Sequence, residues 1–110
     1  MTDWKIVFLP EADDDFGDLA GNQKKVVSKI LARVSKNPLP SNEGGYGKPL
    51  RNNNDTKLAG LLKIKLKKEG IRIVYKVIRT ETEMLIIVIG ARADDEVYEI
   101  ADTRVKKYNL

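Results

Sequence analysis

The chain has 110 residues, 42% of them hydrophobic, which suits one domain over residues 1–110 with a single modest core. It contains no cysteine and no histidine, which excludes disulfides, thiolate catalysis and cysteine-based zinc sites, and removes the commonest general base and metal ligand. If the chain is an enzyme, its acid–base groups must come from Lys, Arg, Tyr, Asp or Glu, and we expect no metal and no cofactor.

The net charge of +4 is unevenly distributed. Residues 1–18 hold six acids and one base, so the remainder carries nineteen bases against ten acids. Such a body attracts polyanions through a salt-sensitive electrostatic term, although many basic domains bind no nucleic acid. The longest apolar run, Met84 to Ile89, is too short to span a membrane, and residues 1–5 lack the order of a secretory signal. We therefore expect a cytoplasmic protein without membrane contact.

The first part of the chain predicts one strand and two helices. Trp4 to Leu9 is rich in β-branched and aromatic residues, and Pro10 suits the start of a short helix. The aspartates that follow complement a helix N-terminus and lack a calcium-loop pattern, so we interpret them as solvated. Asn22 is expected to cap a second helix that runs to about Lys36. Its core stripe is Val26, Val27, Ile30, Leu31 and Val34.

The second part predicts an antiparallel meander and a last helix, after a long proline- and glycine-rich connection over residues 37–58. Apolar and basic residues alternate over 62–67 and again over 71–77, and the run 84–89 predicts a strand buried on both faces. Asp94 or Asp95 is expected to cap the final helix, which buries Val97, Ile100, Ala101 and Val105. The order β-α-α-β-β-β-α predicts an α+β fold, a small antiparallel sheet with helices packed on one face.

One face of the first hairpin of this meander collects cations. A two-residue turn at Glu69-Gly70 places Lys67 opposite Arg72 and Lys65 opposite Val74, and a G1 bulge would shift this register by one. Like charges opposed across a sheet are destabilising unless an anion lies between them, which favours a phosphate site. The alternative is a solvated face whose lysines discourage edge-to-edge association. The basic residues of this face are Lys63, Lys65, Lys67, Arg72 and Lys76.

Two further candidates follow the buried strand. Arg92 comes two residues after Gly90, which ends that strand. Tyr98 lies near the start of the last helix, offset by one residue from the apolar line that Val97 leads, so it suits either the edge of the core or a functional site.

These residues form a pattern that resembles the RelE/ParE toxin superfamily. The stretch K-L-A-G-L-L-K-I-K-L-K-K-E-G-I-R-I-V-Y-K-V-I, residues 57–78, is similar to the central hairpin of RelE-type toxins. The stretch V-I-G-A-R-A-D-D-E-V-Y, residues 88–98, is similar to the segment that follows it. The phrase Y-G-K-P-L, residues 46–50, is common just before that hairpin. The motifs cover residues 46–98, and the order of elements extends the resemblance to nearly the whole chain.

The resemblance implies a toxin of a type II toxin–antitoxin system that cuts messenger RNA in the ribosomal A site. Its partners would be a cognate antitoxin that folds over the basic sheet, the mRNA, and operator DNA through the antitoxin only. The residues it implies are Lys63 and Lys65 along the scissile phosphate, Arg72 as transition-state stabiliser, Arg92 as proton donor and Tyr98 on the substrate base. We add Lys67, Lys68 and Lys76 as RNA-binding residues.

The implied chemistry is consistent with the composition. RNA supplies its own nucleophile, the 2′-OH, so cleavage would leave a 2′,3′-cyclic phosphate and a 5′-OH. Nearby like charge disfavours a protonated lysine, which would let Lys65, or else Lys63, act as base. Arginine is a poor acid at its usual pKa, so Arg92 is better interpreted as a phosphate ligand. Two alternatives stay open: a ParE-like toxin that inhibits DNA gyrase without cutting RNA, and a non-catalytic RNA-binding module.

Overall fold

A computed structural model describes residues 4–50, 58, 60–91 and 94–110, without the side chains of residues 94 and 95. Among its helices, none has both the length and the apolar character needed to cross a bilayer. The elements are β1 (Lys5–Phe8), α1 (Pro10–Gly17), α2 (Gly21–Val34), the 3-10 helix η1 (Ser41–Glu43), β2 (Lys48–Pro49), β3 (Leu62–Leu66), β4 (Ile71–Ile78), the 3-10 helix η2 (Arg79–Glu81), β5 (Glu83–Gly90) and α3 (Asp94–Lys107).

The strands form one sheet of five, in the order β1-β5-β4-β3-β2. β1 runs parallel to β5, and the other neighbours are antiparallel. The α+β class and the β3–β4–β5 meander predicted from sequence are confirmed. The short strand β2 is an addition, because residues 37–58 were expected to form a connection without a strand.

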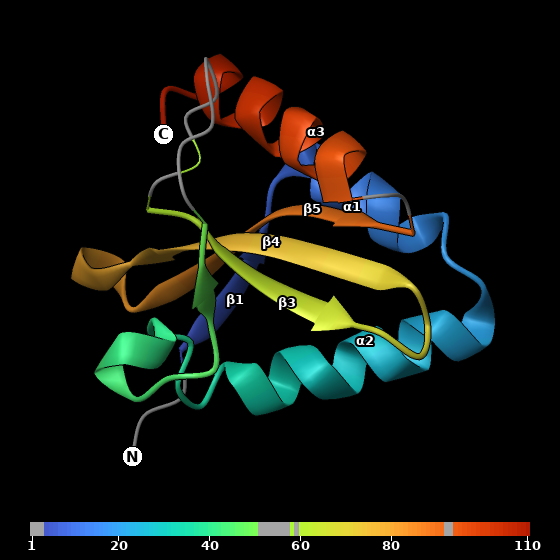
Figure 1. The fold of residues 1–110 in the computed structure, drawn as a ribbon, viewed down its shortest axis with the longest axis horizontal. Helices are drawn as coiled ribbons and strands as arrows, with labels where there is room; N and C mark the ends of the chain where they lie inside the picture. The colour runs from blue at the N-terminus through green and yellow to red at the C-terminus, as the bar shows by residue number, and fades with distance from the viewer. Residues whose placement is uncertain (1–3, 51–57, 59, 92–93) are drawn as a thin grey trace.

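The prediction that the helices pack on one face of the sheet is wrong. α2 and α3 lie on opposite sides of it (Figure 1). Adjacent strand residues point to opposite faces. On β3, Lys63 reaches Tyr98 of α3. Its neighbour Leu62 pairs with Tyr75, whose hydroxyl donates to the Pro38 carbonyl beyond the end of α2. The physical reason is that β5 is apolar on both faces from Met84 to Ile89, so each face needs a helix to cover it.

The helix ends follow the expected patterns with small shifts. Pro10 begins α1 as predicted. α2 begins at Gly21 with Ala20 as its N-cap, so the prediction that Asn22 caps this helix is wrong. The Ala20 amide donates to the Gln23 side-chain oxygen at 3.0 Å, which satisfies one N–H of the first turn. α2 ends at Val34, two residues before the expected Lys36. The buried helix residues are Val27, Leu31 and Val34 on α2 and Val97, Ala101 and Val105 on α3.

An ion pair covers the outer edge of β5 where β1 stops pairing at Ile86. The Ile89 amide donates to Asp15 Oδ2 at 3.1 Å, and Arg104 Nη1 donates to the Ile87 carbonyl at 2.9 Å. Arg104 Nη1 also lies 2.6 Å from Asp15 Oδ2. The pair thus takes the place of a neighbouring strand and joins α1 and α3 to the sheet.

A second contact between the same helices involves Glu11. Its carboxylate accepts hydrogen bonds from Lys107 Nζ at 2.8 Å and from the Tyr108 hydroxyl at 2.7 Å. The hydrogen bond from Lys107 and then that from Tyr108 lower the pKa of Glu11 to about 2. Glu11 and Asp15 therefore hold α1 against α3, and the interpretation of the aspartates as solvated is wrong for Asp15.

Close packing explains two glycines of the connection before β2. A Cβ on Gly45 would collide with the Leu39 carbonyl, and one on Gly47 would collide with the Tyr75 hydroxyl and Leu62. Tyr75 is fully buried, and burial raises the pKa of its hydroxyl above the usual range. Glycine therefore lets this segment lie directly against the sheet, which is what brings β2 beside β3.

Candidate functional site

The register of the β3–β4 hairpin decides which cations meet. Lys65 lies directly opposite Arg72, and Lys63 lies opposite Val74. The predicted two-residue turn, with Lys67 opposite Arg72, is wrong because residues 67–70 connect the strands, with φ of Gly70 at +70°. The observed register differs from the predicted one by two residues. A shift of two leaves every side chain on its face, so Lys63, Lys65 and Arg72 still share one face.

Tyr98 joins this face from α3. Lys63 Nζ donates to the Tyr98 hydroxyl at 3.1 Å and lies 5.5 Å from the centre of the ring. Tyr98 is half-buried, while its neighbour Val97 is fully buried. A Cβ on Gly90 would lie 3.3 Å from Val97, so the start of α3 sits tightly on the end of β5. This packing is what holds Tyr98 over the β3 lysines.

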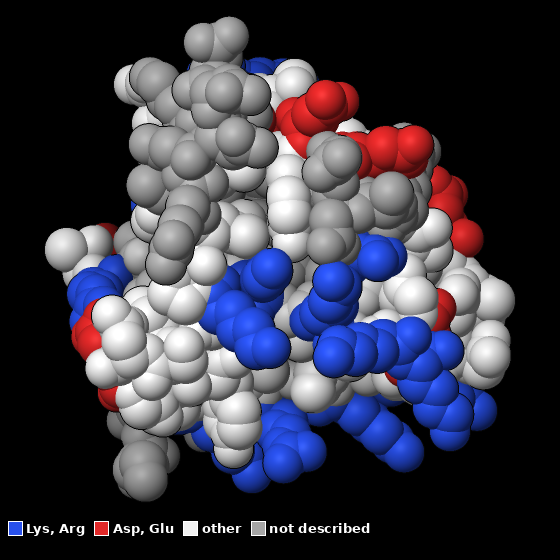
Figure 2. Space-filling view, viewed as in Figure 1, with Lys and Arg blue, Asp and Glu red and all other residues white. Residues whose placement is uncertain are grey.

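Arg72 and Lys65 lie at the turn end of the hairpin. Arg72 is half-buried, and its Nη1 atom donates to the Gly70 carbonyl at 3.3 Å. Lys65 is exposed. Figure 2 shows lysine and arginine side chains gathered across the middle and lower part of the visible face, with acidic residues above them near α3. Charge on this side of the molecule is therefore segregated, as a surface for a polyanion requires.

The other predicted RNA-binding residues separate into two groups. Lys67 and Lys68 are exposed in the β3–β4 turn, next to Lys65 and Arg72. Lys76 lies further along β4, where its Nζ atom donates to the Leu110 carbonyl at 3.1 Å, and the structure does not bring it to the Lys63–Tyr98 contact. Arg92 lies outside the described residues.

Lys48 is a basic residue that the sequence did not single out for this face. It lies directly opposite Lys63 across the β2–β3 pair, so both side chains leave the same face of the sheet. Lys48 belongs to the phrase Y-G-K-P-L. Its position opposite Lys63 depends on how the long connection folds back against β3. The cations that the structure brings together are Lys48, Lys63, Lys65, Lys67, Lys68 and Arg72.

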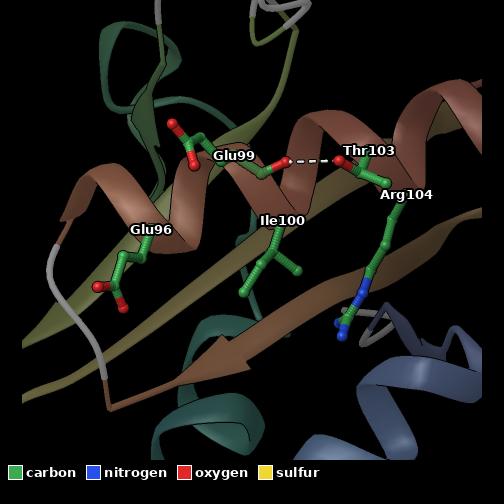
Figure 3. Close-up of a pocket in the computed structure, with 5 residues that line it drawn as sticks. All are labelled: Glu96, Glu99, Ile100, Thr103 and Arg104. Carbon is green, nitrogen blue, oxygen red and sulfur yellow. Dashed lines mark hydrogen bonds between the residues drawn. The ribbon is translucent and has the colours of Figure 1, made fainter.

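A separate pocket of about 340 Å³ lies along α3. Figure 3 shows Glu96, Ile100 and Arg104 pointing from one side of that helix, with Arg104 turned toward α1, where its partner Asp15 lies. Two glutamates and an already paired arginine make this pocket unsuited to phosphate. Among the side chains that the structure describes, no cluster of acids could hold a metal ion. The cationic face is therefore the better candidate site.

Comparison with solved structures identifies the fold. The chain is 27% identical to a mutant of the E. coli toxin RelE in the free state, over 94% of this chain and 99% of that one, with a TM-score of 0.72. It is 25% identical to a chain of the RelBE2 toxin–antitoxin complex from Mycobacterium tuberculosis, over 86% and 97%, with a TM-score of 0.67. It is also 25% identical to the isolated E. coli RelE toxin, over 93% of this chain and 98% of that one, with a TM-score of 0.67. No protein-family model and no curated protein matches the sequence.

Over the described residues, the open five-stranded sheet with its three α-helices matches the fold of RelE toxin structures. Within that class the chain is similar to RelE structures over nearly its whole length, so the RelE-type toxin predicted from sequence is confirmed. The same similarity supports a toxin of a type II toxin–antitoxin system.

Proposed function

We propose that the chain is a metal-independent endoribonuclease that cuts mRNA in the ribosomal A site. The observation that carries the proposal is the Lys63–Tyr98 contact of 3.1 Å beside the Lys65–Arg72 pair. These groups come from β3, β4 and α3, far apart in sequence, and include cations for phosphate and a ring for a base. Their meeting on one face is what an RNA-cleaving site without histidine needs.

The reaction would use the nucleophile that RNA carries. The 2′-oxygen would bond to the adjacent phosphorus while the bond from phosphorus to the 5′-oxygen breaks, which yields a 2′,3′-cyclic phosphate and a 5′-OH. Lys65, exposed on β3 directly opposite Arg72, is proposed to accept the 2′-OH proton. Arg72 would stabilise the charge that develops on the phosphate oxygens. Arg92 is proposed as a ligand of the phosphate, and the leaving 5′-oxygen would take its proton from water.

Tyr98 is proposed to stack on or orient the substrate base. Its ring is half-buried, and its hydroxyl accepts a hydrogen bond from Lys63 Nζ at 3.1 Å, which restrains its orientation before RNA binds. Preorganised stacking groups of this kind contribute about 1–3 kcal/mol per base. Lys67 and Lys68 are proposed to bind the backbone further along the strand.

A cognate antitoxin is the proposed protein partner. The solved structures that this chain resembles include complexes of RelE-type toxins with antitoxins. An antitoxin segment that folds over the cationic face would block RNA, and operator DNA would be reached through the antitoxin only. The proposed compartment is the cytoplasm, where ribosomes translate mRNA.

Induced expression in cells tests the proposal, with primer extension on a translated and an untranslated copy of one message. Cuts on the translated copy alone are the expected result. Cuts on both copies would indicate a nuclease that acts on free RNA. Growth arrest with neither copy cut would contradict the proposal, and DNA damage that depends on gyrase would then support the ParE-like alternative.

A further inference from the structure

We infer that Lys48 is a further RNA-binding residue, which contacts the phosphate backbone together with Lys63 and extends the site across β2. The inference rests on the proposed function and identifies a contact that positions the substrate. It follows from the strand register, because Lys48 and Lys63 lie fifteen positions apart in sequence and directly opposite each other in the sheet.

The backbone around Lys48 is anchored on both sides. Before it, Gly47 packs against the Tyr75 hydroxyl so closely that a Cβ would not fit. After it, the Leu50 amide donates to the Leu61 carbonyl at 2.9 Å. The position from which the Lys48 side chain projects is therefore set by the sheet, while the side chain itself is exposed.

The repulsion between Lys48 and Lys63 favours a bound anion. Directly opposed side chains on an antiparallel pair have Cβ atoms roughly 4.5–5.5 Å apart, and like charges at that separation destabilise the sheet. Within the part of the chain that the structure describes, neither Lys48 nor Lys63 forms a salt bridge with a carboxylate. A phosphate between the two ammonium groups would offset their repulsion, and proteins use such contacts to position nucleic acid.

The surface beyond Lys48 suits a ligand longer than one phosphate. Tyr46 is 50% exposed, and the Arg33 guanidinium of α2 lies 5.8 Å from its ring centre. The basic band in Figure 2 continues from the middle of the visible face to its lower part. Exposed rings beside cations are the features with which proteins bind single-stranded RNA. A single-stranded RNA that passes Lys63 and Lys48 is therefore the ligand class that fits.

An exposed lysine on an edge strand could instead serve only to prevent edge-to-edge association. The chain supplies a matched control for this possibility. Lys5 is an exposed lysine on β1, the strand at the opposite edge of the same sheet. Lys5→Ala and Lys48→Ala therefore remove the same charge from the same kind of strand, and only Lys48 faces Lys63.

The test is single-turnover cleavage on ribosomes programmed with mRNA, at several toxin and salt concentrations. Lys48→Ala is expected to raise the toxin concentration at half-maximal rate roughly tenfold, which corresponds to one lost charge-assisted hydrogen bond, with the maximal rate within about twofold of wild type. The slope of log affinity against log salt should become shallower by roughly 0.7, the value for one phosphate contact on a single strand. Lys48→Arg should restore affinity, and Lys5→Ala should match wild type.

Failure of the inference and failure of the proposed function give different results. If the wild type cuts RNA and Lys48→Ala behaves like Lys5→Ala, the inference is wrong and the proposed function stands. If the wild type cuts nothing, fluorescence anisotropy with a single-stranded RNA oligonucleotide decides about Lys48. A shallower salt dependence of RNA binding in Lys48→Ala than in Lys5→Ala would support the contact. Equal slopes for the two variants would overturn it. A melting temperature of Lys48→Ala at or above that of the wild type excludes a folding defect.

Discussion

Charged residues meet in two regions of this molecule, and they meet in opposite ways. Between α1 and α3, Arg104 lies 2.6 Å from Asp15 and Lys107 lies 2.8 Å from Glu11. On the β2–β3–β4 face the sheet sets cation against cation, Lys48 against Lys63 and Lys65 against Arg72. Between α1 and α3, the pairs of opposite charge join the two helices, and Asp15 also accepts a hydrogen bond from the edge of β5. Opposed like charges cost stability, which is why we propose an anionic ligand at Lys48 and Lys63.

The largest effect that this comparison predicts is on catalysis. Lys65→Ala should lower the maximal rate of single-turnover cleavage at least about 100-fold, because it removes the proposed general base. Urea unfolding of the variant checks that the protein is folded under the assay conditions. Lys5→Ala is the control. Cleavage by Lys65→Ala at the wild-type rate would show that the base is another group.

A large loss of stability is expected at the ion pair between the helices. Asp15→Asn removes the partner of a guanidinium whose side chain is 15% exposed, and weakens the acceptor of the Ile89 amide. Unfolding in urea should show a loss of about 2 kcal/mol, as for a charged hydrogen-bonded group left without its partner. Asp13→Asn, exposed on the same helix, should change stability by less than about 0.5 kcal/mol. Equal stability of both variants would mean that Asp15 does not hold α1 against β5.

Two tyrosines separate the roles of the two faces of the sheet. Tyr75→Phe leaves the buried Pro38 carbonyl without its 2.7 Å hydrogen bond and should lower the free energy of unfolding by about 1–2 kcal/mol, with cleavage unchanged while the protein is folded. Tyr98→Phe keeps a ring but loses the bond to Lys63, so it should lower cleavage severalfold with little effect on stability. Urea unfolding and single-turnover cleavage on both variants check the pair. The opposite pattern would place the function on the α2 side.

The smallest effect is on the pH dependence of stability. The pKa of Glu11 falls from 4.5 to about 2 in the folded chain, through its hydrogen bonds with Lys107 and Tyr108. A lowered folded-state pKa means that the ionised carboxylate stabilises the fold above about pH 4.5. That contribution disappears as the pH falls from there toward 2. Melting temperatures at intervals from pH 5 to pH 2.5 should therefore fall less steeply in Glu11→Gln than in the wild type. Parallel curves would show that this contact does not contribute.

Local patterns of the sequence predicted β1, β3, β4 and β5 and which basic residues share the candidate face. Alternation has a period of two in a strand, so Lys63 and Lys65 had to share a face whatever their neighbours were. The apolar run 84–89 predicted the interior strand β5, because a strand covered on both faces is apolar throughout. The motif resemblance predicted that Tyr98 lies with the β3 lysines, and Lys63 Nζ contacts the Tyr98 hydroxyl.

What the tertiary structure decided depends on contacts between distant residues. The length of the β3–β4 turn set the register, and a shift of two residues changed every partner while it left every face intact. Lys48 entered the site only because Gly47 packs against Tyr75, which no local pattern encodes. Likewise Asp15 belongs to a half-buried ion pair because α3, encoded about ninety residues later, lies beside α1. Periodicity specifies which side of an element is buried, whereas the partner that buries it is specified only when the whole chain has packed.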